Sequence, residues 1–286
     1  MNSRQLINNI YFYGYCVSLV TLVVSLTIFL SFRSLRCTRI RIHTQLYASL
    51  ALNCIFWIAW FQLVVASSNV IALNPTWCVV LHILTQYFML CNYFWMFCEG
   101  VHLHIVLVVV FVKDNVAMRI FMVIGWGLPM IYVGIYSFLR CWVEESYYNW
   151  ILTIPVMILL LCSAVFLINI VRVLITKLHP KSVSPAPIAI KKAVRATLIL
   201  IPLFGLQQCL LPFRPDKDSS FEFSYQLMSA VLVSLQGFCV SLLFCFLNHE
   251  VISAVHNYLN SLCPRVFTNL NRRYAPPATT TRDMVV

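Results

Sequence analysis

The chain has 286 residues, of which 61% are hydrophobic and only 10% are charged, and its formal net charge is +11. Soluble domains of this size carry far more charge, so the composition excludes an ordinary soluble protein and indicates one that crosses a membrane. Because lipid offers no partners to unpaired backbone groups, the expected fold class is an all-α membrane protein.

Seven apolar stretches are long enough to cross a bilayer, which takes about 20 helical residues. In chain order they are residues 10–32, 46–65, 78–112, 118–139, 150–175, 193–213 and 223–247. The sequence therefore predicts a seven-transmembrane helix bundle over residues 10–248. It is preceded by a short extracellular stub, 1–9, without a signal peptide. An amphipathic juxtamembrane segment, 249–274, and a disordered polar tail, 275–286, follow it.

Basic residues gather in alternate loops, and this asymmetry orients the bundle. They are Arg33, Arg36, Arg39 and Arg41 after the first stretch, Lys113 and Arg119 after the third, Lys177, Lys181, Lys191, Lys192 and Arg195 after the fifth, and Arg265, Arg272, Arg273 and Arg282 in the tail. The opposite loops are poor in basic residues and contain Glu144, Glu145, Asp216, Asp218 and Glu222. We expect the N-terminus outside and the C-terminus in the cytoplasm. The positive charge then faces membrane lipids and needs no nucleic-acid partner.

Glu99 is the one acidic residue within the predicted spans. A carboxylate at membrane depth is costly unless it has a partner, so Glu99 should face the interior. His43 lies at the start of another apolar stretch, near the same predicted membrane face. The two residues predict a polar latch between neighbouring helices, which is typical of a signalling receptor.

Most of the 12 cysteines lie within apolar stretches and are interpreted as small packing residues. Cys78 and Cys141 lie on the predicted outer side, where conditions are oxidising, so we expect a disulfide between them. Two free thiols are the alternative. Cys263, in the basic segment after the last span, is a candidate for palmitoylation, with an unmodified thiol as the alternative.

The sequence contains no HExxH motif, no Gly-rich phosphate loop and no Cys-x-x-Cys pair. His102 and His104 are two positions apart, and this spacing on a helix does not present both rings to one metal ion. We therefore expect no enzyme activity, no cofactor and no metal.

Eight stretches, in order, carry a more specific signal. They are RIRIH (39–43), NYFWMFCEGVHLH (92–104), GWGLP (125–129), NIVRVLITKL (169–178), KAVRATLILIPLFG (192–205), LPFRP (211–215), SLQGF (234–238) and FCFLNHEV (244–251). With them the chain resembles the class B, or secretin-like, G-protein-coupled receptors over nearly its whole length after Leu6. Within that family it is most similar to the branch of the calcitonin receptor and of the receptors for calcitonin-like diuretic hormones.

The resemblance implies roles for several polar residues. Arg39, His43, Glu99 and Thr197 would form a cytoplasmic polar network that holds the inactive state, and Lys177, Lys192, Arg195 and Glu250 would line the G-protein cavity with them. Phe244 stands where the family often has tyrosine, so the network has one hydrogen bond fewer. Asn53, Asn92, Gln207 and Gln236 would form a central polar network. Amides inside a membrane need partners, so simple helix adhesion is the alternative reading.

Pro202 and Gly205 mark a place where the sixth helix can bend, because proline removes a backbone hydrogen bond and glycine lowers helix propensity. The resemblance implies that the cytoplasmic half of this helix swings outward to admit a G protein. A permanent kink without a switching role is the alternative.

The resemblance also implies a plasma-membrane, multi-pass receptor for a calcitonin-like peptide hormone. Such a receptor signals through a stimulatory G protein, adenylate cyclase and cyclic AMP, and an accessory single-span membrane protein is a further candidate partner. We expect the hormone-capturing N-terminal ectodomain of the family to be absent. One alternative is a truncated, non-signalling isoform or fragment that acts on a full-length receptor. A transporter or channel is another, but it would need a continuous polar path or paired helix breaks.

Overall fold

The computed structural model describes residues 3–32, 37–66, 75–106, 114–139, 150–178 and 221–262. All regular elements in these ranges are helices: α1 (Ser3–Ser31), α2 (Thr38–Trp60), η2 (Phe61–Val65), α4 (Thr76–His104), α5 (Asp114–Met122), η4 (Val123–Gly127), α6 (Leu128–Leu139), α7 (Trp150–Leu178), α9 (Glu222–Ser234), α10 (Gln236–Ser241), η7 (Leu242–Phe246) and α11 (His249–Leu262). The η elements are single π-helical turns that continue the neighbouring α-helices. The predicted all-α fold is thus confirmed for the part of the chain that is described.

Five helical segments in the described ranges are long and apolar enough to cross a membrane: Arg4–Ser31, Thr38–Val65, Thr76–His104, Val116–Phe138 and Trp150–Ile170. A sixth candidate is the pair Glu222–Ser234 and Gln236–Phe246, which is bent by 43°. These segments correspond to the first five predicted spans and the seventh. The sixth predicted span, residues 193–213, lies outside the described residues, so the count of seven stays a prediction.

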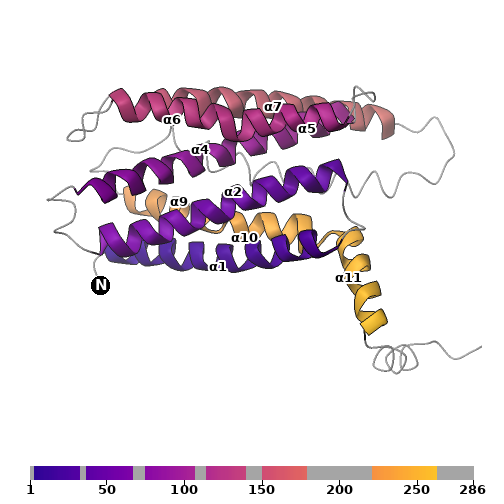
Figure 1. Cartoon of the computed structure of the whole chain (residues 1–286), viewed down its shortest axis with the longest axis horizontal. Helices are drawn as coiled ribbons and strands as arrows, with labels where there is room; N and C mark the ends of the chain where they lie inside the picture. The colour runs from indigo at the N-terminus through magenta and orange to yellow at the C-terminus, as the bar shows by residue number, and fades with distance from the viewer. Residues whose placement is uncertain are drawn as a thin grey trace, which may run out of the picture.

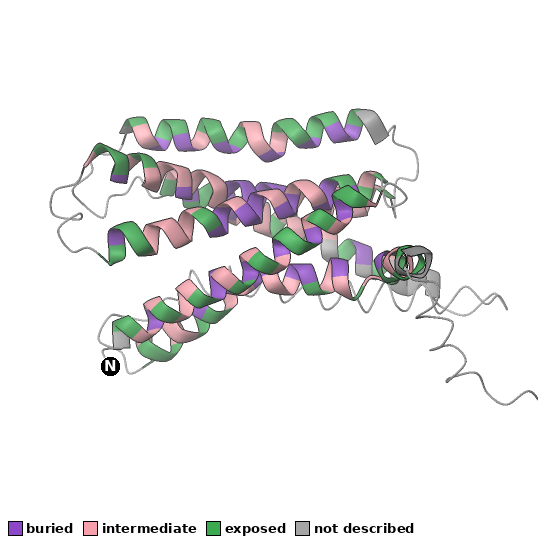
Figure 2. Ribbon diagram, turned by 60° about the horizontal axis from the view of Figure 1, so that its bottom comes forward, coloured by how far each residue is buried: buried purple, intermediate pink, exposed green. Residues whose placement is uncertain are grey.

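The long helices lie side by side along one direction, and α11 runs across that direction at one end (Figure 1). The most extensive packing joins α2 to α4, α1 to α2, and α4 to α7. Buried residues occupy the faces that the helices turn toward one another, and exposed residues cover the outer faces (Figure 2). The outer faces are apolar, with Val20, Ile131 and Ile158 largely exposed, as expected of helices that face lipid.

Two helices begin earlier than hydropathy predicts. Helix α1 starts at Ser3, so residues 3–9, predicted as a stub, belong to a helix in which Ile7 is buried. Helix α2 starts at Thr38 and includes the basic RIRIH motif, whereas the predicted span started at residue 46. Polar and charged residues lower the hydropathy of a helix end, but their long side chains reach the membrane interface without interrupting the helix.

The centre of the bundle contains Trp95 of α4, which is fully buried. Gly125 of η4 faces its indole, and a Cβ added at Gly125 would collide with the ring. Trp126 packs edge-on against Trp95 with ring centroids 6.0 Å apart. The GWGLP motif therefore supplies a close approach between α4 and the π-turn η4.

The bend between α9 and α10 is held by a hydroxyl from α1. Ser18 Oγ donates to the Ser234 carbonyl at 2.5 Å and accepts from the Phe238 amide at 3.1 Å. A helix break within a membrane leaves backbone groups that need partners, and this serine supplies them. The bend places Gln236 on the inner side of the bundle, where it is buried.

Candidate functional site

The strongest candidate site lies at the end of the bundle where α2 begins, α4 ends and α11 crosses; we call this the α11 end. His43 lies in the second turn of α2, and Glu99 lies near the end of α4. Because the two helices are antiparallel neighbours, both residues reach the same level. His43 Nδ1 is 3.4 Å from Glu99 Oε1, and the side chains are 5% and 16% exposed. We call these two residues the latch.

The latch is a close contact but an incomplete one. No hydrogen bond to a described residue is made by His43 Nδ1 or by Glu99 Oε2, although both atoms are buried. A buried polar atom without a partner costs free energy, about 1–3 kcal/mol for a neutral group. Because the contact leaves these two atoms unpaired, breaking it and forming a different arrangement of the two side chains would cost little free energy.

Phe244 of η7 closes one face of the latch. Its ring centroid is 4.4 Å from that of His43, and the ring planes are inclined by 37°. In the sequence, Phe244 is notable because it lacks the hydroxyl of the tyrosine that the family resemblance implies at this position. The structure adds that its ring packs directly on the imidazole from the π-helical turn η7 (Leu242–Phe246).

Arg39, one turn before His43 on α2, extends the site toward α11. Its Nη2 is 2.8 Å from Glu250 Oε2 in the first turn of α11. Asn248 accepts a hydrogen bond from the Glu250 amide at 3.0 Å and so caps this helix start. Both charged side chains are about half exposed, at 48% and 62%, so the pair contributes at most about 1 kcal/mol. Its importance is geometric, because it joins α2 to α11.

Tyr47, one turn after His43, is a further site residue that was not predicted from the sequence. Its buried hydroxyl donates to the Val240 carbonyl at 3.1 Å, next to η7. Arg39, His43 and Tyr47 are thus spaced at i, i+4 and i+8 along α2, and each contacts a different part of residues 240–250. The spacing of four was visible in the sequence and could have revealed the third member.

The central amides are described for three of their four members. Asn53, Asn92 and Gln236 are all buried. Gln236 Nε2 donates to Met96 Sδ at 3.4 Å, whereas Asn53 Oδ1 and Asn92 Oδ1 have no hydrogen-bond partner among the described residues. The structure thus brings these three amides into the interior but does not bond them to one another. The central network stays a prediction.

Several predicted site residues lie outside the described residues. They are Cys141, Lys192, Arg195, Thr197, Pro202, Gly205, Gln207 and Cys263, and the side chain of Lys177 is also not described. Cys78 is buried in the first turn of α4. The disulfide, the bend of the sixth helix and the G-protein cavity therefore remain predictions.

The two histidines of the H-x-H pair contact different helices. The His102 ring lies against Phe121 of α5, with centroids 6.3 Å apart. The His104 Nε2 is 2.9 Å from Asn169 Nδ2 of α7. Both residues contribute to helix packing at the end of α4.

Comparison with known proteins shows the family to which the chain belongs. Residues 4–240 match the family model "7 transmembrane receptor (Secretin family)". The chain belongs to the secretin family of seven-transmembrane receptors. It is therefore a multi-pass protein of the plasma membrane in a receptor family that is not enzymatic.

Among curated proteins, the chain is similar to two calcitonin-type receptors. It is 38% identical to the calcitonin gene-related peptide type 1 receptor of Oncorhynchus gorbuscha over 255 residues, 86% of this chain and 54% of that protein. It is 37% identical to the calcitonin receptor of Homo sapiens over 250 residues, 85% of this chain and 52% of that protein. The corticotropin-releasing factor receptor 2 of Xenopus laevis is 36% identical over 251 residues, 84% of this chain and 60% of that protein. The chain spans about half the length of the first two relatives.

Proposed function

We propose that this secretin-family chain is the membrane part of a receptor for a calcitonin-like peptide hormone. It signals through a stimulatory G protein and raises cyclic AMP. Similarity at 37–38% identity to proteins named for calcitonin and calcitonin gene-related peptide supports the ligand class. The family resemblance adds a second argument. It implies that Asn53 and Gln207 stand at positions where many relatives carry arginine and histidine, and that the calcitonin branch departs there too.

The observation that carries the proposal is the buried contact between His43 and Glu99. A bundle that only needs stability has no use for a carboxylate here, because apolar side chains of similar volume pack as well or better. A polar contact with unsatisfied atoms provides instead an interaction that one conformation makes and another breaks. The latch is therefore interpreted as a restraint on the inactive state.

The contacts around the latch connect it to neighbouring helical segments. Arg39 and Tyr47 tie α2 to α11 and to the segment before η7, and Phe244 packs between them on His43. Opening the α11 end requires several of these contacts to change together. An agonist outside and a G protein inside both favour the open state, so binding of either increases the affinity for the other.

The experiment is a tethered agonist. A calcitonin-like peptide, or a calcitonin-family ectodomain, is fused before Ser3, and cyclic AMP is measured at equal surface density. Tethering supplies a local concentration in about the millimolar range, and it can raise apparent affinity by about 10²–10⁴. We expect a cyclic AMP response that a scrambled peptide on the same tether does not give.

Silence of all tethered forms in cyclic AMP and in G-protein recruitment, with the chain at the cell surface, would contradict the proposal. The chain would then be better described as a non-signalling form that acts on a full-length receptor. That alternative predicts a reduced response when the chain is co-expressed with an intact calcitonin-type receptor. Recruitment of another G-protein class alone would retain the receptor and reject the stimulatory coupling.

A further inference from the structure

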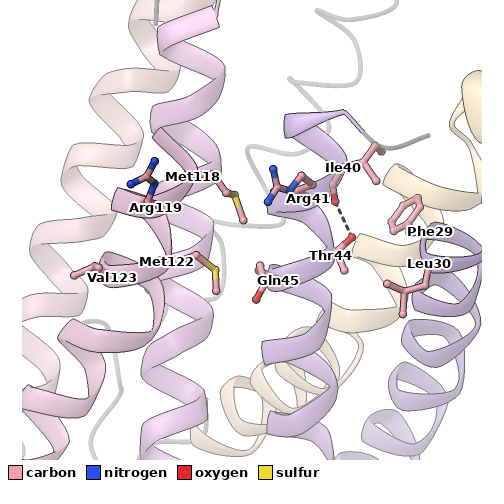
Figure 3. A pocket seen from close by; sticks show the side chains of 10 residues that line it. All are labelled: Phe29, Leu30, Ile40, Arg41, Thr44, Gln45, Met118, Arg119, Met122 and Val123. Carbon is pink, nitrogen blue, oxygen red and sulfur yellow. Dashed lines mark hydrogen bonds between the residues drawn. The ribbon is translucent and has the colours of Figure 1, made fainter. Parts of the chain in front are cut away.

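A cavity of about 740 Å³ opens between α1, α2, α5 and η4 at the α11 end of the bundle (Figure 3). It is separate from the latch, because neither His43 nor Glu99 lines it. Its volume falls within the range of about 300–1,000 Å³ that small-molecule sites occupy. No part of the proposed hormone response uses it.

One part of the cavity wall is apolar and adaptable. Phe29 and Leu30 contribute from the end of α1, and Met122 and Val123 contribute from the opposite side. Met118 and Met122 are four residues apart and so lie on one face of α5. Flexible thioether side chains adjust to irregular apolar ligands, so this wall suits a hydrocarbon chain.

The other part of the wall presents hydrogen-bond donors. Arg41 and Arg119 lie at similar levels on α2 and α5 (Figure 3), and both are exposed. Gln45 lies one turn from Arg41, and its Oε1 accepts from Trp126 Nε1 at 3.1 Å. The amide NH₂ group of Gln45 therefore remains as a donor without a hydrogen bond to any described residue. The Thr44 hydroxyl is already used, because it donates to the Ile40 carbonyl at 2.8 Å.

This donor set has no negative partner within the described part of the chain. Neither Arg41 nor Arg119 forms an ion pair there. The carboxylates whose side chains are described make other contacts: Glu250 with Arg39, Glu99 with His43, and Glu222 with Gln226. The charged residues that line the cavity, Arg41 and Arg119, are both positive, so the complementary ligand is an anion.

We propose that this cavity binds an anionic diacyl glycerophospholipid. Its phosphate lies at the level of Arg41 and Arg119, and an acyl chain covers the apolar wall that includes Leu30 and Met122. Arginine suits this role because its planar fork of donors matches a phosphate group. The predicted orientation places the cavity in the cytoplasmic leaflet, where anionic lipids are found.

A lipid fits both halves of the wall better than the other candidates. A soluble anion would use the arginines but not the apolar wall. A single-span protein helix would cover the apolar wall, but at this level it offers apolar side chains rather than a compact anion. Only an amphiphile with an anionic head and a hydrocarbon tail satisfies the guanidinium groups and the methionines together.

The test is native mass spectrometry of the purified full chain in detergent. Phosphatidylserine and phosphatidylcholine with identical acyl chains are added in equal amounts, and glycerophosphoserine serves as a headgroup without tails. We expect phosphatidylserine to be retained in preference to phosphatidylcholine, and glycerophosphoserine not to compete. Removing both charges in Arg41→Gln/Arg119→Gln should weaken phosphatidylserine retention about thirtyfold, since each basic residue contributes about 1 kcal/mol.

Two further variants separate the site from general charge effects. Arg172→Gln removes an exposed arginine of α7 that does not line the cavity, and it should leave lipid retention unchanged. Met122→Trp fills the apolar wall while keeping both arginines, and it should reduce retention at least fivefold. If the double variant does not fold, the single variants Arg41→Gln and Arg119→Gln should each weaken retention about fivefold.

Three results would overturn the proposal. Equal retention of both lipids would show ordinary annular lipid. Unchanged phosphatidylserine retention in the arginine variants would place the lipid elsewhere. Effective competition by glycerophosphoserine would show a site for soluble anions.

Discussion

Phe244 packs its ring on the imidazole of His43, with centroids 4.4 Å apart and planes inclined by 37°. The position is one where the family resemblance implies a tyrosine, and the structure shows what the phenylalanine does in its place. It shields one face of a buried imidazole whose Nδ1 has no hydrogen bond to a described residue. The contact joins η7 to α2 through packing rather than through a hydroxyl.

Replacing Phe244 with leucine should therefore raise ligand-free cyclic AMP. Leucine keeps the residue apolar but removes the ring contact, which is worth about 0.5–1.5 kcal/mol in aromatic pairs. If the contact exists only in the inactive state, basal signalling should rise about twofold to tenfold. The comparison is made at matched surface expression. Replacing Phe246 with leucine, in the same π-turn, is the control and should have a smaller effect.

Gly125 and Gly134 provide a matched pair for testing the centre of the bundle. Gly125→Ala should destabilise the protein strongly, because the new Cβ would collide with the buried Trp95 ring. Gly134→Ala on α6 meets no heavy atom within 4 Å and should be neutral or stabilising by up to about 1 kcal/mol. Thermal unfolding in detergent measures both, and equal melting temperatures for the two variants would contradict the packing described for η4.

Removing the Tyr47 hydroxyl should destabilise the α11 end. Tyr47→Phe removes the hydrogen bond from the Tyr47 hydroxyl to the buried Val240 carbonyl, which contributes about 0.5–1.5 kcal/mol. Tyr13→Phe is the control, because Tyr13 is 66% exposed on α1. Hydrogen exchange of residues 240–246 and the melting temperature are the measurements. A melting temperature as little changed as that of the control would show that this hydrogen bond does not hold η7 in place.

The predicted disulfide between Cys78 and Cys141 can be tested by substituting each cysteine. If Cys78 and Cys141 are bonded, Cys78→Ser and Cys141→Ser should impair surface expression or hormone response to the same degree. The double variant should be no worse than either single variant, since one bond is lost in all three. Mass spectrometry of the oxidised surface protein gives the direct answer, and two free thiols would rule the bond out.

Some of this site could be predicted from the sequence, because membrane physics constrains it. Glu99 had to find a partner inside the bundle, and His43 was a polar residue near the same predicted face. The structure places them 3.4 Å apart. Consecutive spans cross the membrane in opposite directions, so the start of the second span and the end of the third lie near the same membrane face.

Other contacts could not be predicted in this way. Hydropathy gives the length of a span but not the direction of a helix that crosses its end, so the ion pair of Arg39 with Glu250 on α11 was not foreseen. The sequence also does not mark π-helical turns, and Phe244 lies on one of them, η7. The early start of α2 was hidden by the arginines of RIRIH, which lower hydropathy while remaining helical.

The central claim is that the latch restrains the inactive state, and ligand-free cyclic AMP tests it most directly. His43→Ala, Glu99→Ala and the double variant are compared with the unchanged chain at equal surface density. We predict raised basal cyclic AMP in both single variants and a double variant little above either, because both changes remove the same contact. Basal cyclic AMP at or below that of the unchanged chain in all three variants, with normal surface expression, would contradict the account.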